Sequence, residues 1–133
     1  MDYIKYSYIA LIGWGFWAIG SKLLSRSLNT ESLSFWISLW SLILLSLFIF
    51  FKKSLIVNIY SFYAIPVGIV SLIAILAFYK ALKEGPSSVV IPLTNLYVIF
   101  PVLFGILFLK EEITAIRILG IAFAVLGAIF LSL

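Results

Sequence analysis

The fold is decided by residues 62–109, which read FYAIPVGIVSLIAILAFYKALKEGPSSVVIPLTNLYVIFPVLFGILFL. Two apolar runs flank a short charged turn, and each run is long enough for the roughly 20 residues of a membrane-spanning helix. Gly85 suits the left-handed end of a helix, and Pro86 prevents the helix from continuing. The stretch therefore predicts a hairpin of two transmembrane helices.

The rest of the chain repeats this pattern of apolar runs and short polar connections. Of the 133 residues, 65% are hydrophobic and only 11% are charged, against about 25% in an ordinary soluble domain. Each run must be helical, because a backbone in lipid has to satisfy its own hydrogen bonds. The prediction is an all-α integral membrane protein with five transmembrane helices, which cover residues 3–24, 31–51, 62–82, 87–109 and 113–133.

Composition excludes several classes of function. The chain has no cysteine and no histidine, so thiolate metal sites, disulfides and imidazole bases are absent. Because no cluster of base, nucleophile and metal ligands is found in the sequence, we expect neither an enzyme nor a metal or cofactor site. The nine Lys and Arg residues are scattered between apolar runs, which favours membrane lipids over nucleic acid as partners.

The cations are almost evenly divided between the two sides of the membrane. With five spans, the N-terminus and the second and fourth connections share one side. That side carries Lys5, Lys52, Lys53, Lys110 and Arg117, and the other side carries Lys22, Arg26, Lys80 and Lys83. Orientation normally follows an excess of Lys and Arg on the cytoplasmic side, so a balanced chain can insert both ways round. The alternative is a single orientation set by the first helix or by the Lys52-Lys53 pair.

Several motifs follow one another along the chain. They are Trp14-Gly15 with Lys22, residues 78–93 (FYKALKEGPSSVVIPL), Pro101, residues 107–112 (LFLKEE) and residues 117–120 (RILG). Their order is similar to that in the EamA domain of the drug/metabolite transporter superfamily. The chain resembles this domain over nearly its whole length, and the second half of the match is the more specific. Lys110 stands where relatives often have glycine.

This resemblance implies secondary transport of small metabolites, often export, across a cell membrane, here a prokaryotic inner membrane. Most relatives carry two such domains as inverted repeats, so five helices would form one half of an inverted-repeat transporter. The missing half would then come from a second copy of opposite orientation, giving an antiparallel homodimer as in the related small multidrug resistance proteins. The balanced cations agree with that expectation.

The fourth span contains the polar side chains that are candidates for binding a substrate. Pro92 and Pro101 interrupt its helix, and broken helices in transporters lie where the backbone lines a cavity. Thr94, Asn95 and Tyr97 lie between the two prolines. The alternative for Asn95 is a hydrogen bond between helices that only stabilises the bundle.

Aromatic and basic side chains supply the remaining substrate-binding candidates. Trp14 and Trp17 share a face of the first helix and would form a wall for an apolar or cationic organic compound, with Tyr79 as a gate or an interfacial anchor. Lys22 and Lys80 lie near helix ends on the same side of the membrane, where they would attract an anionic group or extend to the lipid headgroups.

Small residues line one side of the last span, namely Gly120, Ala124, Gly127 and Ala128. Small residues let two helices approach closely, so this side is the predicted dimer interface. Packing within a single protomer is the competing account.

The expected function is therefore alternating-access transport of a small metabolite or an amphipathic organic compound. Proton coupling is not expected, because every acidic residue lies near the end of a span. A lipid-linked sugar flippase subunit, a non-transporting assembly subunit and a piece of a longer transporter are the alternatives. The start at Met1 and the terminal span favour a complete unit over the last of these.

Overall fold

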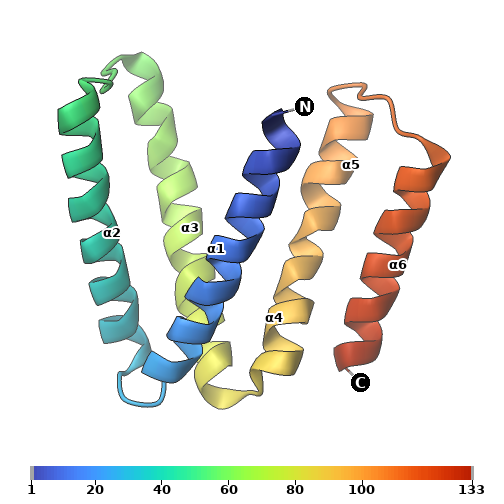
Figure 1. Cartoon of the computed structure of the whole chain (residues 1–133), viewed down its shortest axis with the longest axis horizontal. Helices are drawn as coiled ribbons and strands as arrows, with labels where there is room; N and C mark the ends of the chain where they lie inside the picture. Colours follow the sequence, from blue (N-terminus) through green and yellow to red (C-terminus); the bar gives the residue numbers. More distant parts are fainter. Residues whose placement is uncertain (1, 133) are drawn as a thin grey trace. The chain divides into compact units, whose positions relative to one another are not determined.

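The structure is a computed structural model that describes residues 2–132, and its described part consists of helices and connections without strands. In chain order the elements are α1 (Asp2–Leu24), α2 (Thr30–Lys52), α3 (Ile59–Glu84), α4 (Ser87–Asn95), the 3₁₀ helix η1 (Leu96–Val98), α5 (Ile99–Leu107) and α6 (Ala115–Ser132). These elements are shown in Figure 1. The all-α prediction is confirmed.

Three of the described segments are long and apolar enough to cross a membrane: α2, α3 and the continuous stretch Ser87–Leu107. The apolar part of α6, Ile118–Leu131, is shorter. Helix α1 has 23 residues and is less hydrophobic on average than α2 and α3. These lengths and compositions are those of an integral membrane protein.

Helix α3 begins at Ile59, three residues before the predicted start at residue 62. The reason is a cap that the hydropathy pattern does not reveal. The Asn58 side chain accepts a hydrogen bond from the Tyr60 amide at 3.0 Å, and the Ser61 hydroxyl accepts one from the Asn58 amide at 3.2 Å. Reciprocal bonds of this kind satisfy amides that have no partner inside the first helical turn.

Helix α2 begins after a similar polar cap. The Asn29 side chain accepts a hydrogen bond from the Ser32 amide at 2.8 Å, and Glu31 places a negative charge in the first turn. The helix ends at Lys52, and the following residue, Lys53, adopts the left-handed conformation (φ 50°) that more often holds glycine.

Replacing Asn29 with alanine is expected to lower the free energy of unfolding by about 1 kcal/mol, because the Ser32 amide loses its acceptor. Reversible unfolding in mixed detergent micelles would measure the change. Ser27→Ala, an exposed substitution in the same connection, is the matched control and should leave stability unchanged. An Asn29→Ala variant as stable as this control would contradict the capping role.

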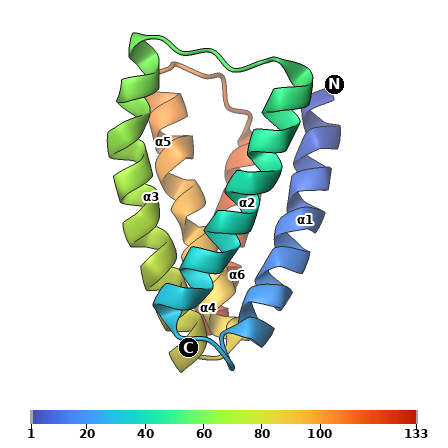
Figure 2. The ribbon, with the colours of Figure 1, turned by 90° about the vertical axis from the view of Figure 1, so that its left-hand side faces the viewer.

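The chain divides into two compact units, one reaching to Glu84 and one starting at Gly85. In the first unit, α3 packs against both α1 and α2. The ends of the helices nearest the α1–α2 connection lie together in both Figure 1 and Figure 2. The buried side chains of this unit lie there: Ala18, Ser21, Ser25, Leu33, Ser34, Tyr79 and Leu82.

The opposite halves of α2 and α3 have almost no buried residues. Every residue of α3 from Ile59 to Ala74 is exposed, and so is nearly all of α2 beyond Trp40. Such apolar surfaces are compatible with lipid, which is as apolar as leucine and gives helices no hydrophobic reason to associate. The first unit is therefore held together at one end.

In the second unit, α6 packs against α4, and α5 continues from α4 through η1. Val90, Gly105 and Ala128 are its buried residues among those described. Most of its large apolar side chains are exposed, as expected for helices that face lipid.

Candidate functional site

The predicted break in the fourth span lies between its two prolines. Helix α4 ends at Asn95, a single 3₁₀ turn follows, and α5 starts at Ile99. The 3₁₀ turn begins where the Leu96 amide bonds the Leu93 carbonyl, three residues earlier. Pro92 and Pro101 lack an amide hydrogen, so the carbonyls four residues before them receive no helical hydrogen bond from these positions. The span is thus irregular at mid-length, between the two prolines.

The polar side chains of this break differ in how well they are satisfied. The Thr94 hydroxyl donates to the Val90 carbonyl at 2.5 Å, with a second acceptor, the Ile91 carbonyl, at 3.1 Å, so its hydrogen bonds stay within its own helix. Asn95 and Tyr97 are exposed, and the side-chain amide of Asn95 forms no hydrogen bond with any residue that the structure describes. A side-chain amide without a hydrogen-bond partner is energetically costly at the middle of a membrane span. Asn95 is therefore the stronger candidate for contacting a substrate or another helix.

Trp17 and Tyr79 meet across the interface between α1 and α3. The Trp17 ring stacks on Phe78, with centroids 5.4 Å apart and planes inclined by 12°, and its centroid lies 5.9 Å from that of Tyr79. Tyr79 is only 1% exposed, which is too buried for an anchor among lipid headgroups. Trp14 is 65% exposed and lies outside this cluster. The structure thus brings together Trp17 and Tyr79, two of the four predicted aromatic candidates, and adds Phe78.

Two buried hydroxyl groups accompany these rings. The side chains of Ser21 and Tyr79 are each 1% exposed. Neither hydroxyl oxygen has a hydrogen-bond partner of normal geometry in the described part of the chain, although Ser21 and Trp17 face the tyrosine hydroxyl. Buried hydroxyls without partners are unusual in folded proteins. A bound water or a polar group of a substrate would satisfy both.

Lys22 has a structural partner sixty residues away in sequence. Its ammonium donates a hydrogen bond to the Leu82 carbonyl at 2.5 Å, and the side chain is half-buried. Carbonyls in the last turn of a helix have no helical donor, and a cation there also interacts favourably with the helix dipole. Lys22 therefore joins the end of α1 to the end of α3, which is neither of the roles predicted for it.

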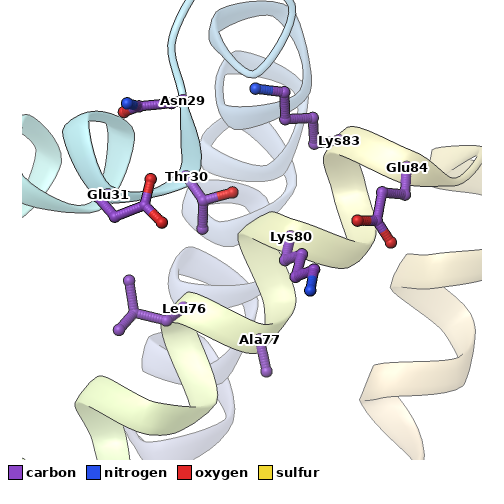
Figure 3. A pocket seen from close by; sticks show the side chains of 8 residues that line it. All are labelled: Asn29, Thr30, Glu31, Leu76, Ala77, Lys80, Lys83 and Glu84. Carbon is purple, nitrogen blue, oxygen red and sulfur yellow. The ribbon is translucent and has the colours of Figure 1, made fainter.

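Lys80 lines a shallow groove of about 510 Å³ in the first unit. Side chains from the start of α2 and the last turns of α3 form this groove (Figure 3): Asn29, Thr30, Glu31, Leu76, Ala77, Lys80, Lys83 and Glu84. Two lysines and two glutamates balance one another there. The groove therefore has no net charge with which to attract a simple anion.

The small residues of α6 fall into two groups. Ala128 is buried, at 9% exposure, in a unit where α6 packs against α4. Gly120, Ala124 and Gly127 are exposed, and a Cβ atom added to either glycine would meet nothing within 4 Å. Three of the four predicted interface residues thus leave open space beside the helix, and Ala128 serves packing within the protomer.

Comparison with known proteins identifies the family. The EamA-like transporter family matches residues 3–133. The chain belongs to this family. Its helices and its apolar composition agree with an integral membrane protein of this family.

Two curated relatives of this EamA-like chain are informative. An uncharacterized transporter from the cobO 3′ region of a Sinorhizobium species is 40% identical over 57 residues, which are 43% of this chain and 40% of the relative. An uncharacterized protein of Methanocaldococcus jannaschii is 38% identical over 71 residues, which are 53% of this chain and 52% of the relative. The matched stretches thus span about half the length of these relatives. No solved structure matches the chain.

Some features of the site could not be found in the sequence of this EamA-like chain. The partner of Lys22 is a backbone carbonyl, which carries no residue-specific signal. Phe78 was visible beside Tyr79, but only the packing of α1 on α3 identifies it as the platform for Trp17. Asn29, which caps α2, also lines the groove, and no sequence pattern indicates this second position.

Proposed function

We propose that this EamA-like chain is a secondary transporter of a small metabolite or an amphipathic organic compound, and that it works as an antiparallel, dual-topology homodimer by alternating access. Family membership over residues 3–133 gives the class of function. The proposed substrate pathway rests on one observation: the fourth span is interrupted, and the side-chain amide of Asn95 at its middle has no hydrogen-bond partner in the described part of the chain. We expect no catalytic activity and no cofactor.

The helix break supports a substrate pathway at the centre of the membrane. Irregular backbone at that depth is tolerated only where protein or a water-filled cavity surrounds it. The Thr94 hydroxyl donates its hydrogen bond to a carbonyl of its own helix, α4, whereas Asn95 and Tyr97 remain available to a ligand or to a second protomer. Within the first unit, the Trp17–Tyr79 cluster and the buried hydroxyls of Ser21 and Tyr79 offer a separate aromatic and hydrogen-bonding surface.

Two features support pairing with an inverted copy. The cations are divided five to four between the two sides, which gives no strong preference for one orientation. The open face of Gly120, Ala124 and Gly127 would let α6 approach a neighbouring helix closely. In relatives with two repeats, the odd number of spans makes the second repeat enter the membrane in the opposite orientation. For this chain, a second copy inserted the other way round would supply that half of the transporter.

The membrane we propose is the prokaryotic cell (inner) membrane, since both matched relatives come from prokaryotes. A lipid-linked sugar flippase is a weaker candidate. It needs Lys22 and Lys80 to receive a phosphate, and Lys22 already bonds the end of α3.

Transport is tested by comparing the small molecules released by cells that express the wild-type chain, the Asn95→Leu variant or an empty vector. Mass spectrometry of the medium should find at least one compound that the wild type exports several-fold faster than the vector control. Asn95→Leu should reduce that excess about tenfold at equal membrane abundance, whereas Leu93→Ala, an exposed neighbour, should not. A medium that is identical for wild type and vector would favour the non-transporting assembly subunit.

A further inference from the structure

The second unit carries an apolar groove that the proposed transport pathway does not use. It encloses about 710 Å³ and follows α5 and the connection after it. Eight of its nine lining residues, between Phe100 and Leu109, have no polar side chain. The ninth is Glu111, which places a single carboxylate in an otherwise apolar surface.

The position of Glu111 depends on a close contact with α5. Its amide donates a hydrogen bond to the Gly105 carbonyl at 3.1 Å. The carboxylate lies directly over Gly105, since a Cβ atom built on that glycine would be 2.9 Å from Glu111 Oε2. Lys110 adopts a left-handed conformation (φ 52°) that helps to turn the chain back towards the helix. The carboxylate is therefore placed by the fold of the connection.

The groove has the dimensions of one lipid leaflet. From Phe100 to Phe108 the helix rises about 12 Å at 1.5 Å per residue. Half of a hydrocarbon core of roughly 30 Å is about 15 Å. The stacked rings of Phe104 and Phe108, with centroids 4.9 Å apart, form a wall along this length. Glu111 follows the end of the helix, where a lipid lying along the groove would place its headgroup.

We propose that this groove binds a phospholipid with a primary ammonium headgroup. One acyl chain lies along Phe104 and Phe108, and the ammonium donates hydrogen bonds to the Glu111 carboxylate. No ion pair reaches Glu111 from the side chains that the structure describes, so the carboxylate is available to a cation. A negative charge at this level disfavours anionic lipids, and the exposed Lys110 beside it suits the phosphate of a zwitterionic headgroup.

Lipid binding to the purified protein in detergent tests the proposal without any transport assay. Phosphatidylethanolamine, phosphatidylcholine and phosphatidylglycerol with identical acyl chains are compared by native mass spectrometry and by thermal melting. We expect phosphatidylethanolamine to bind at least fivefold more tightly than the other two lipids. Glu111→Gln should abolish this preference, whereas Glu112→Gln, the same change at an exposed neighbour outside the groove, should preserve it.

A second series keeps the test independent of variants that fail to fold. Successive N-methylation converts phosphatidylethanolamine into phosphatidylcholine and removes one hydrogen-bond donor at each step. Affinity of the wild-type protein should fall with each methyl group. Equal affinity across the series, or a preference that survives in Glu111→Gln, would overturn the proposal. So would stabilisation by tetraphenylphosphonium alone, which would assign the groove to a soluble cation, or loss of a dimer in Glu111→Gln, which would assign it to a second copy.

Discussion

Substituting Tyr79 with alanine is expected to lower the free energy of unfolding by about 2–3 kcal/mol and to abolish transport. Tyr79 is among the largest fully buried side chains described, and it contacts the rings of Trp17 and Phe78 where the first unit is packed. The helices stay in the lipid environment when the protein unfolds, so the loss of stability comes mainly from the cavity that the smaller side chain leaves. A void of roughly 100 Å³ costs about 2.4 kcal/mol at 24 cal/mol per Å³. Reversible unfolding in mixed micelles measures the change.

Two further tyrosine variants isolate the cause. Tyr63→Ala makes the same substitution on the same helix at a side chain that is 65% exposed, and it should change stability by less than about 0.5 kcal/mol. Tyr79→Phe removes only a buried hydroxyl without a partner, so stability should stay equal or rise slightly. A loss above about 1 kcal/mol in Tyr79→Phe would contradict the view that this hydroxyl is unsatisfied in the protein alone.

Substituting Lys22 with methionine is expected to destabilise the first unit by about 1.5–3 kcal/mol, because a charge-assisted hydrogen bond is lost and the Leu82 carbonyl loses its donor. Methionine retains an unbranched apolar side chain, so packing changes little. Equilibrium unfolding is again the measurement. Lys22→Arg should restore part of the stability, because it supplies a cationic donor of similar reach.

Lys80→Met is the matched control, since Lys80 is exposed and lies one turn from the same helix end. This variant should be as stable as the wild type within about 0.5 kcal/mol. The opposite pattern, a stable Lys22→Met protein with lost transport, would return Lys22 to the role of attracting an anionic substrate and would contradict its structural assignment.

The elements of the fold were predictable where local chemistry determines them. The Gly85-Pro86 turn and the polar connection before α2 act within a few residues, so the start of α2 and the end of α3 lie within two residues of their predicted positions. The start of α3 was misplaced because the Asn58–Ser61 cap lies in a stretch that also reads as a polar connection.

Contacts between distant helices could not be predicted in this way. A lysine near a helix end has the same local sequence whether it extends to headgroups or bonds a carbonyl of another helix, and only the packing of α1 on α3 distinguishes the two for Lys22. The same packing separates Trp17 from Trp14, which share a helical face but differ in their neighbours. Among the α6 side chains that the structure describes, only Ala128 is buried, and hydropathy alone does not distinguish it from its apolar neighbours.

The central claim, an antiparallel homodimer of oppositely inserted chains, is tested most directly by topology. The chain has no cysteine, so Ser27→Cys in the first connection and Ser54→Cys in the second can each be labelled in intact cells with a membrane-impermeant maleimide without background. Both serines are exposed and, in the five-span topology, lie on opposite sides of the membrane. The account predicts labelling of each site in about half of the molecules. Complete labelling of one site and none of the other would contradict it and would require a parallel dimer or a separate partner chain.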